Sequence, residues 1–229
     1  MTFASKPHRP IRSFVRREGR ITPSQQRALH ELWPRYGIEP GATLLNFTKV
    51  FEHSAPVVLE IGFGNGDSLC AMAATEPQKN FLGIEVHRPG VGKLLHSLAA
   101  GQVNNVRVLI DDAKDVLAGR IPDASLAAVQ LFFPDPWPKT RHRKRRLLQP
   151  DFVELVGAKL EPGGKFYLAT DVGDYAEQML TVLTAAPGFE NLAGAGGFAP
   201  RPDFRPLTKF ERRGQRLGHA VWDLAFQRR

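Results

Sequence analysis

Short apolar runs alternate with helical patterns from Val57 to Ala185, and this alternation restricts the possible folds more than any other feature. Each run has the length of a single strand, and stretches with the periodicity of amphipathic helices separate the runs. Strand–helix–strand order implies parallel strands with helices on both faces of the sheet. We therefore expect an α/β fold with a doubly wound, mostly parallel, Rossmann-like sheet. The five expected strands are Val57–Ile61, Phe81–Glu85, Val106–Ile110, Leu126–Phe133 and Lys165–Thr170.

The two ends of the chain carry their own signals. Thr22, Pro23 and Gln25 have the arrangement of a helix start with a capping box, and that helix should end by the residue before Pro34. Near the C-terminus, Ala220, Trp222, Leu224 and Phe226 alternate with His219, Val221, Asp223 and Ala225. This alternation predicts a strand at the sheet edge, antiparallel to its neighbour.

Positive charge is concentrated in two segments of an otherwise slightly acidic chain. The 229 residues include 31 Lys and Arg against 23 Asp and Glu, a net charge of +8. Residues 6–27 and 139–146 each carry a net +6, which leaves −4 for the remainder. Such clustering favours a nucleic-acid contact surface over a merely solvated face. We expect residues 1–20 to form a flexible basic arm and residues 21–229 a single domain.

Composition excludes several classes of protein. Cys70 is the only cysteine, so neither an intramolecular disulfide nor a cysteine-cluster zinc site is available. The seven histidines show no metal-ligand spacing, and we expect no metal site. No apolar run reaches membrane-spanning length, and the N-terminus lacks the apolar core of a secretory signal. We expect a cytoplasmic protein with no membrane or obligate protein partner, and leave open whether it is a monomer or a homodimer.

Every strand of the expected parallel core ends in, or is followed by, an acid. Ligands of such folds bind at the carboxyl ends of the strands, so these carboxylates should surround one site. They would repel the pyrophosphate of a dinucleotide. S-adenosylmethionine instead brings a cationic sulfonium and ammonium, and a ribose diol that needs acceptors. The acids are Glu60, Glu85, Asp111 with Asp112, Asp135 and Asp171.

The turn after the first strand favours the same cofactor. Gly62, Gly64 and Gly66 form a GxGxG pattern, whereas dinucleotide-binding folds use GxGxxG. Glu85 lies nineteen residues beyond Gly66, where an acid would reach the ribose hydroxyls. We expect the three glycines and Glu60 to contact S-adenosylmethionine, and a dehydrogenase is the least favoured reading.

A stiff loop and a dense basic segment follow the fourth strand directly. Prolines at alternate positions around Asp135 restrict the backbone, so its carboxylate should have little conformational freedom. Six Lys or Arg within residues 139–146 would attract a polyanion. The sequence therefore predicts a placed acid beside a phosphate-binding surface.

This loop and its basic run, residues 133–146, resemble the signature of bacterial tRNA (guanine-N7)-methyltransferases. Residues 59–66, 169–171, 205–214 and 218–224 also match that family, and the likeness extends from about Gly19 to the C-terminus. The resemblance implies a class I methyltransferase fold. It also implies an RNA-binding enzyme of tRNA processing, which transfers a methyl group from S-adenosylmethionine to N7 of a guanosine in the tRNA variable loop.

The resemblance further implies roles for individual residues, with Asp135 as the catalytic, active-site residue. The implied cofactor-contacting acids are Glu60, Glu85, Asp112 and Asp135. The implied RNA-interacting basic segment consists of Arg141, His142, Arg143, Lys144, Arg145 and Arg146. The other implied substrate contacts are Lys139, Asp171, Thr208, Lys209, Phe210 and Glu211.

The expected chemistry needs alignment more than a base. Guanine N7 offers an in-plane lone pair and carries no proton to remove. We expect Asp135 to orient the guanine and to favour the positive charge that develops on its ring. Asp171 and Glu211 are candidate acceptors for the guanine N1–H and amino group. Two alternatives stay open: a methyltransferase acting on another nucleic-acid amine, and an RNA-binding module without catalysis.

Overall fold

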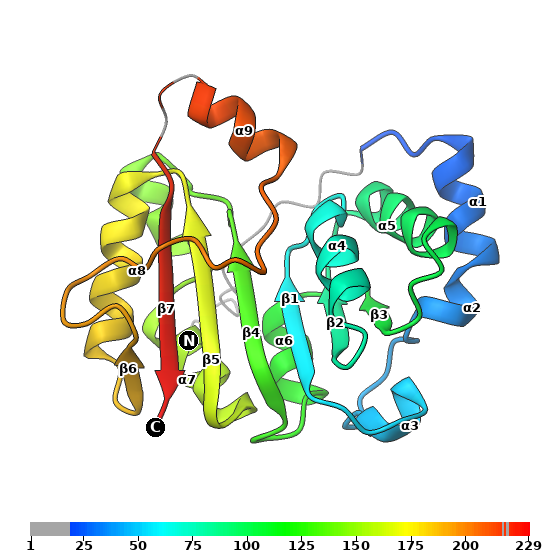
Figure 1. The fold of residues 1–229 in the computed structure, drawn as a ribbon, viewed down its shortest axis with the longest axis horizontal. Coiled ribbons are helices and arrows are strands. Elements are labelled where there is room, and N and C mark those ends of the chain that lie inside the picture. The colour runs from blue at the N-terminus through cyan, green and yellow to red at the C-terminus, as the bar shows by residue number, and fades with distance from the viewer. Residues whose placement is uncertain (1–18, 217, 219) are drawn as a thin grey trace, which may run out of the picture.

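The computed structural model describes residues 19–216, 218 and 220–229. Most of the arm expected at residues 1–20 lies outside these described residues. The strands are β1 Val57–Ile61, β2 Asn80–Ile84, β3 Val106–Leu109, β4 Leu126–Phe132, β5 Leu160–Thr170, β6 Phe189–Asn191 and β7 Trp222–Arg228. They form one seven-stranded sheet in the order β3-β2-β1-β4-β5-β7-β6, with β1 to β5 parallel (Figure 1).

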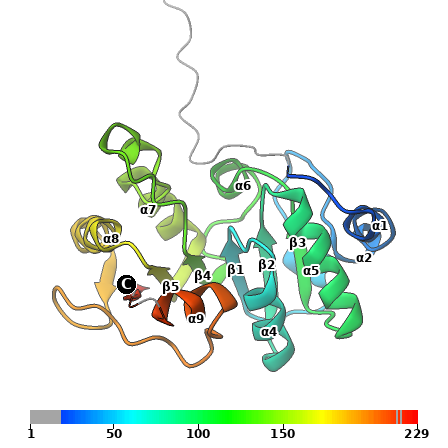
Figure 2. The same ribbon diagram turned by 90° about the horizontal axis from the view of Figure 1, so that it is seen from above.

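Helices cover both faces of this sheet, as the strand–helix alternation predicts. The helices are α1 Pro23–Glu31, α2 Trp33–Tyr36, α3 Phe47–Phe51, α4 Asp67–Thr75, α5 Arg88–Ala100, α6 Ala113–Gly119, α7 Pro150–Lys159, α8 Gly173–Ala185 and α9 Lys209–Arg216. Helices α6, α7 and α8 lie on one face, and α4 and α5 on the other, with α1 packed against α5 (Figure 2). Among the described residues, no helix is both long and apolar enough to cross a membrane.

The structure confirms the expected strands, with one difference at β5. Strand β1 has the predicted bounds, and β2, β3 and β4 differ from prediction by at most one residue at either end. Strand β5 begins five residues early because Leu160 already pairs with Leu126, before a register shift that brings Lys165 opposite Ala128. The register shift is an irregularity within the strand, and near it Gly163 takes a φ of +81°.

The C-terminal strand β7 runs antiparallel to β5, as its alternation predicts. It belongs to the antiparallel edge of the sheet, but the outermost strand is β6, which pairs with the other side of β7. With three residues, β6 is too short to produce a recognisable periodicity. Its position therefore depends on β7, and the sequence did not reveal it.

The expected capping box begins α1. The Gln25 amide donates to the Thr22 Oγ1, at 3.3 Å, and the Thr22 amide donates to the Gln25 Oε1, at 2.9 Å. Helix α1 ends before Pro34, as expected, but Pro34 then occupies the first turn of the short helix α2. This is a position where its missing N–H leaves no helical hydrogen bond unmade.

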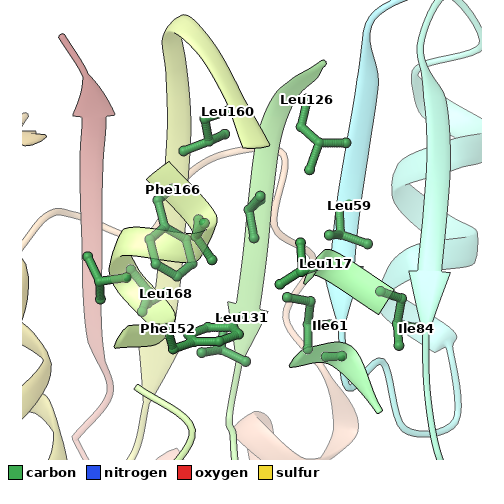
Figure 3. Packing of buried hydrophobic residues seen from close by; sticks show 14 of the residues in the cluster. Leu59, Ile61, Ile84, Leu117, Leu126, Leu131, Phe152, Leu160, Phe166 and Leu168 are labelled. Carbon is green, nitrogen blue, oxygen red and sulfur yellow. The ribbon is translucent and has the colours of Figure 1, made fainter. Parts of the chain in front are cut away.

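Two apolar clusters fill the space between the sheet and its helices, one on each face. Leu59 and Ile61 of β1 pack with Leu131 of β4 and Leu117 of α6 on one face (Figure 3). Each fully buried side chain of this size contributes about 1.5–3 kcal/mol. Because successive residues of a strand point to opposite faces, Glu60 lies on the other face, as a carboxylate within a buried strand.

Candidate active site at the carboxyl ends of the strands

The glycine loop between β1 and α4 is built from left-handed backbone conformations. Gly62, Gly64 and Gly66 have φ values of +72°, +58° and +76°, which favour glycine strongly. A Cβ added at Gly62 or Gly64 would meet no atom within 4 Å, so both leave backbone open to a ligand. At Gly66 a Cβ would lie 2.6 Å from Leu94, so this glycine instead permits close packing of α4 against α5.

The buried Glu85 carboxylate joins the end of β2 to this glycine loop. Its Oε2 accepts a hydrogen bond from the Gly64 amide at 2.8 Å. Its Oε1 accepts from the amides of Val86 and His87, at 2.7 and 2.9 Å. Each carboxylate oxygen has about two lone-pair positions, so the arrangement leaves capacity for a ribose hydroxyl. That contact stays a prediction.

Glu60 is a buried acid with no cationic partner among the described residues. Its side chain is 3% exposed, and its Oε2 has no hydrogen-bond partner among the described residues. Burial, and secondly the charge of Glu85, raise the pKa of Glu60 to about 8. Gln130, its neighbour in β4, also has a buried and unpartnered oxygen, Oε1. A cationic group placed beside Glu60 would favour its ionised form.

A cavity of about 140 Å³ lies where β1, β2, β3 and β4 end. Four residues expected to contact the cofactor line it together, namely Gly62, Glu85, Asp112 and Asp135. Asp112 is also the N-cap of α6, where its Oδ1 accepts from the Lys114 amide at 3.0 Å. The convergence of the strand ends thus assembles residues that are far apart in the sequence.

Asp135 stands on a strained and exposed loop at the rim of this cavity. Phe133 and Trp137, on either side of it, have φ values of +52° and +42°, which non-glycine residues rarely adopt. The Phe133 amide donates to the Ala169 carbonyl at 2.8 Å, and the Trp137 amide donates to Asp135 Oδ1 at 3.1 Å. Such strain persists only where surrounding contacts over-determine the conformation.

The basic segment follows as a 3₁₀ turn, Thr140–Arg145. Lys139, Arg141, Arg143 and Lys144 are exposed, as a phosphate-binding surface requires. The Arg145 guanidinium lies 4.9 Å from the ring centroid of Trp137, and the His142 ring meets the same indole edge-on. Partial burial and the neighbouring cations lower the pKa of His142, which favours a neutral ring.

Arg146 does not belong to that exposed surface, and its expected phosphate contact is not supported. Its side chain is 1% exposed, and its guanidinium is engaged by Pro136, Asp174 and Gln178. The sequence could not single out Arg146 because the six cations look alike in sequence, whereas only the tertiary structure turns one of them inward.

Glu211 is likewise turned inward, away from the guanine-reading position suggested for it. It is 2% exposed, and both its oxygens accept from Arg205 at 2.8 Å. Arg205 also donates to both oxygens of Asp223 in β7, at 2.9 Å. This buried cluster anchors the start of α9 beyond the ends of β4 and β5 (Figure 1).

The remaining expected substrate contacts lie around the same end of the sheet. Asp171 follows β5 and is partly exposed, and Thr208 Oγ1 accepts from the Glu211 amide at 3.1 Å. Lys209 and Phe210 form the first turn of α9, and the structure does not describe their side chains. Sequence reasoning missed Arg205 and Gln130. Gln130 could have been noticed because it is a polar residue inside an apolar run.

A tight contact beneath the glycine loop yields a first prediction. A Cβ at Gly90 in α5 would lie 2.1 Å from the Gly64 carbonyl oxygen, which is backbone and cannot swing away. We expect Gly90→Ala to lower the free energy of unfolding by at least about 2 kcal/mol and to displace the loop. Gly119→Ala is the control, because its Cβ would meet nothing within 4 Å. Equal urea-unfolding midpoints for both variants would contradict this expectation.

The strand order, the glycine loop after β1 and the acid that follows β2 define a class I methyltransferase fold. Solved structures share this fold at low sequence identity. The 16S rRNA methyltransferase KamB matches with a TM-score of 0.60 at 16% identity, covering 85% of this chain and 98% of that one. The 16S rRNA (adenine(1408)-N(1))-methyltransferase of Catenulisporales acidiphilia matches at 0.53 and 15%, covering 81% and 92%.

Closer relatives identify the family. The tRNA (guanine-N(7)-)-methyltransferase of Yersinia enterocolitica is 59% identical over 221 residues, 96% of this chain and 92% of the relative. That of Alkalilimnicola ehrlichii is 58% identical over 228 residues, 99% and 96% of the two chains. A family model described as "Putative methyltransferase" matches residues 54–224. The chain belongs to the tRNA (guanine-N(7)-)-methyltransferase family.

Proposed function

We propose that this protein transfers a methyl group from S-adenosylmethionine to N7 of a guanosine in the variable loop of tRNA. The observation that carries this proposal is that one cavity is lined by Gly62, Glu85, Asp112 and Asp135, with an exposed basic segment directly after it in the chain. Both near-full-length relatives carry the name of this activity. We infer that residues 21–229 act as one domain and that the enzyme works in the cytoplasm, where tRNA is found.

The residues present fit S-adenosylmethionine. Open backbone at Gly62 and Gly64 leaves room for a bound molecule, and the unpartnered Glu60 Oε2 suits its ammonium. Glu85 and Asp112 would accept hydrogen bonds from the ribose and the adenine amine. The bound cofactor supplies a methyl group on a sulfonium, which is electrophilic without further activation. One structural relative was solved with this cosubstrate.

Asp135 performs an orienting and electrostatic role. It lies at the rim of the cofactor cavity, on the side of the basic segment, so a guanine held there meets both. Because N7 carries no proton, the carboxylate has none to remove before transfer. Its negative charge opposes the positive charge that the purine ring gains on methylation. The strained loop holds this charge in place before the substrate arrives.

Labelled methyl transfer tests the proposal directly. S-adenosylmethionine with a labelled methyl group is incubated with unmodified tRNA transcripts, and the modified nucleotide is mapped. N7-methylguanosine is recognised by chain cleavage after reduction and amine treatment. We expect label at a variable-loop guanosine N7. Label on an exocyclic or other amine would support the alternative methyltransferase, and binding of tRNA without label would support the non-catalytic module.

The exposed cations should contribute affinity that depends on salt. Lys144 is exposed, and replacing it with Ala removes one candidate phosphate contact. We expect binding to be weaker for every tRNA, whatever its sequence. The magnitude of the slope of log affinity against log salt should decrease by about 1. Filter binding over a salt series measures both. An unchanged slope would place Lys144 outside the RNA contact.

A further inference from the structure

Arg146 connects the loop that carries Asp135 to helix α8, from inside the protein. We propose that Arg146, with Asp174 as its anchor, is a positioning residue for Asp135 and not a ligand of RNA phosphate. This inference rests on the proposed function, because the reaction it serves is the methyl transfer assigned there. The buried position of the side chain, 1% exposed, is the first observation behind it.

The contact with the loop is direct. The Arg146 Nε donates to the Pro136 carbonyl oxygen at 2.8 Å. Pro136 follows Asp135 in the chain, and its carbonyl belongs to the peptide that leads into Trp137. That same peptide supplies the N–H that Asp135 accepts at 3.1 Å. Arg146 therefore fixes the peptide group on which the orientation of the Asp135 carboxylate depends.

The other side of the guanidinium is fixed to α8. Its Nη2 donates to Asp174 Oδ2 at 2.9 Å, and its Nη1 donates to Gln178 Oε1 at 2.8 Å. Its planar face lies 4.6 Å from the ring centroid of the fully buried Tyr175. A rigid fork of donors on Nε, Nη1 and Nη2 and a flat face are needed for this set of contacts, and lysine offers neither.

Asp174 also meets the exposed basic segment. Its Oδ2 lies 2.6 Å from Nη2 of Arg143, whose side chain is 46% exposed. One carboxylate oxygen thus accepts from an arginine that faces solvent and from the arginine that holds the loop. The connection from α8 to Asp135 therefore begins directly beneath the surface expected to bind phosphate.

The test separates positioning from phosphate binding. Arg146→Lys keeps the charge and removes the fork, and Asp174→Asn removes the anchor from a partly exposed site, so it remains informative if the lysine variant does not fold. Arg229→Lys is the matched control, because Arg229 pairs with Glu190 far along the sheet edge. The readouts are tRNA affinity with its salt slope, the single-turnover rate at saturating substrates, and hydrogen exchange of the Trp137 amide without substrates.

We expect both test variants to lose about 100-fold in the single-turnover rate. The tRNA affinity and salt slope of Arg146→Lys should stay near wild type, and Trp137 should exchange faster in both variants. The control should match wild type throughout. A lower affinity and a smaller salt slope with an unchanged saturated rate would overturn the proposal and make Arg146 a phosphate ligand. Unchanged exchange at Trp137 would also overturn it.

The exchange measurement separates this proposal from the proposed function. If the wild-type protein transfers no methyl to tRNA, the proposed function fails. Faster Trp137 exchange in Arg146→Lys would then still support the hold of Arg146 on the loop, since that measurement needs no substrate. If transfer occurs and exchange is unaffected, the positioning role fails alone.

Discussion

Asp135→Ala is expected to lower the single-turnover rate of methyl transfer to tRNA by at least about 100-fold, with the protein still folded. Asp135 is exposed, and its carboxylate accepts from one backbone amide, so its loss removes little packing. In the proposed mechanism its role is confined to orienting the guanine and opposing the developing positive charge. Rapid-quench measurement with labelled S-adenosylmethionine at saturating tRNA gives the rate.

Asp135→Asn is the informative companion, because it keeps the shape and the acceptor oxygen and removes the charge. If charge is the main contribution, Asn should be nearly as slow as Ala. If orientation through the Trp137 amide is the main contribution, Asn should recover much of the rate. A rate for Asp135→Ala within about threefold of wild type would remove Asp135 from the mechanism, since that change is below 1 kcal/mol.

Glu60→Gln is expected to change how stability depends on pH. Its pKa is raised to about 8 in the folded protein, from the 4.5 of an unperturbed glutamate. Between these values the folded state binds more protons than the unfolded state, so stability falls as pH rises. Glu60 alone should cost on the order of 4 kcal/mol between pH 5 and pH 9. Above a pH of about 8 the loss should level off.

Urea unfolding of the cofactor-free protein at pH 5 and pH 9 measures this effect. The Gln variant should lose markedly less stability across the interval than wild type. Glu154→Gln, on the exposed side of α7, is the control and should follow wild type. Parallel pH dependences for wild type and Glu60→Gln would show that Glu60 does not titrate in this range.

Binding of the cofactor should also change the protonation of Glu60. At pH 7 the buried Glu60 is largely protonated, and a cation placed beside it favours the ionised form. Binding of S-adenosylmethionine should therefore release a proton, which calorimetry in two buffers of different ionisation enthalpy detects. Glu60→Gln should release less. Equal proton release in the two proteins would place the ammonium elsewhere.

Much of the site could be predicted because its residues follow local rules. Glu85, Asp112 and Asp135 each lie within two residues of the end of an apolar run, and parallel strands bring their carboxyl ends to one edge. The glycine pattern predicts a turn after the first strand, and Gly62, Gly64 and Gly66 form that turn in left-handed conformations. These predictions needed only strand order and backbone chemistry.

Arg146 and Glu211 are buried, and local rules could not predict this. Arg146 is one of six cations in eight residues, and nothing local distinguishes it from Lys144. It is buried because α8 supplies Asp174 and Gln178 as acceptors and Tyr175 as a stacking ring. Glu211 is buried because it shares Arg205 with Asp223 of β7.

The sequence by itself determined the parallel core, the glycine loop and the acids at the strand ends. Those features depend on hydrophobic periodicity and on backbone conformations that single residues specify. Only the tertiary structure decided which charged side chains face solvent and which hold the loop of Asp135. A buried charge is tolerated only where distant segments supply its partners. Strand and helix patterns carry no information about which distant segments come into contact.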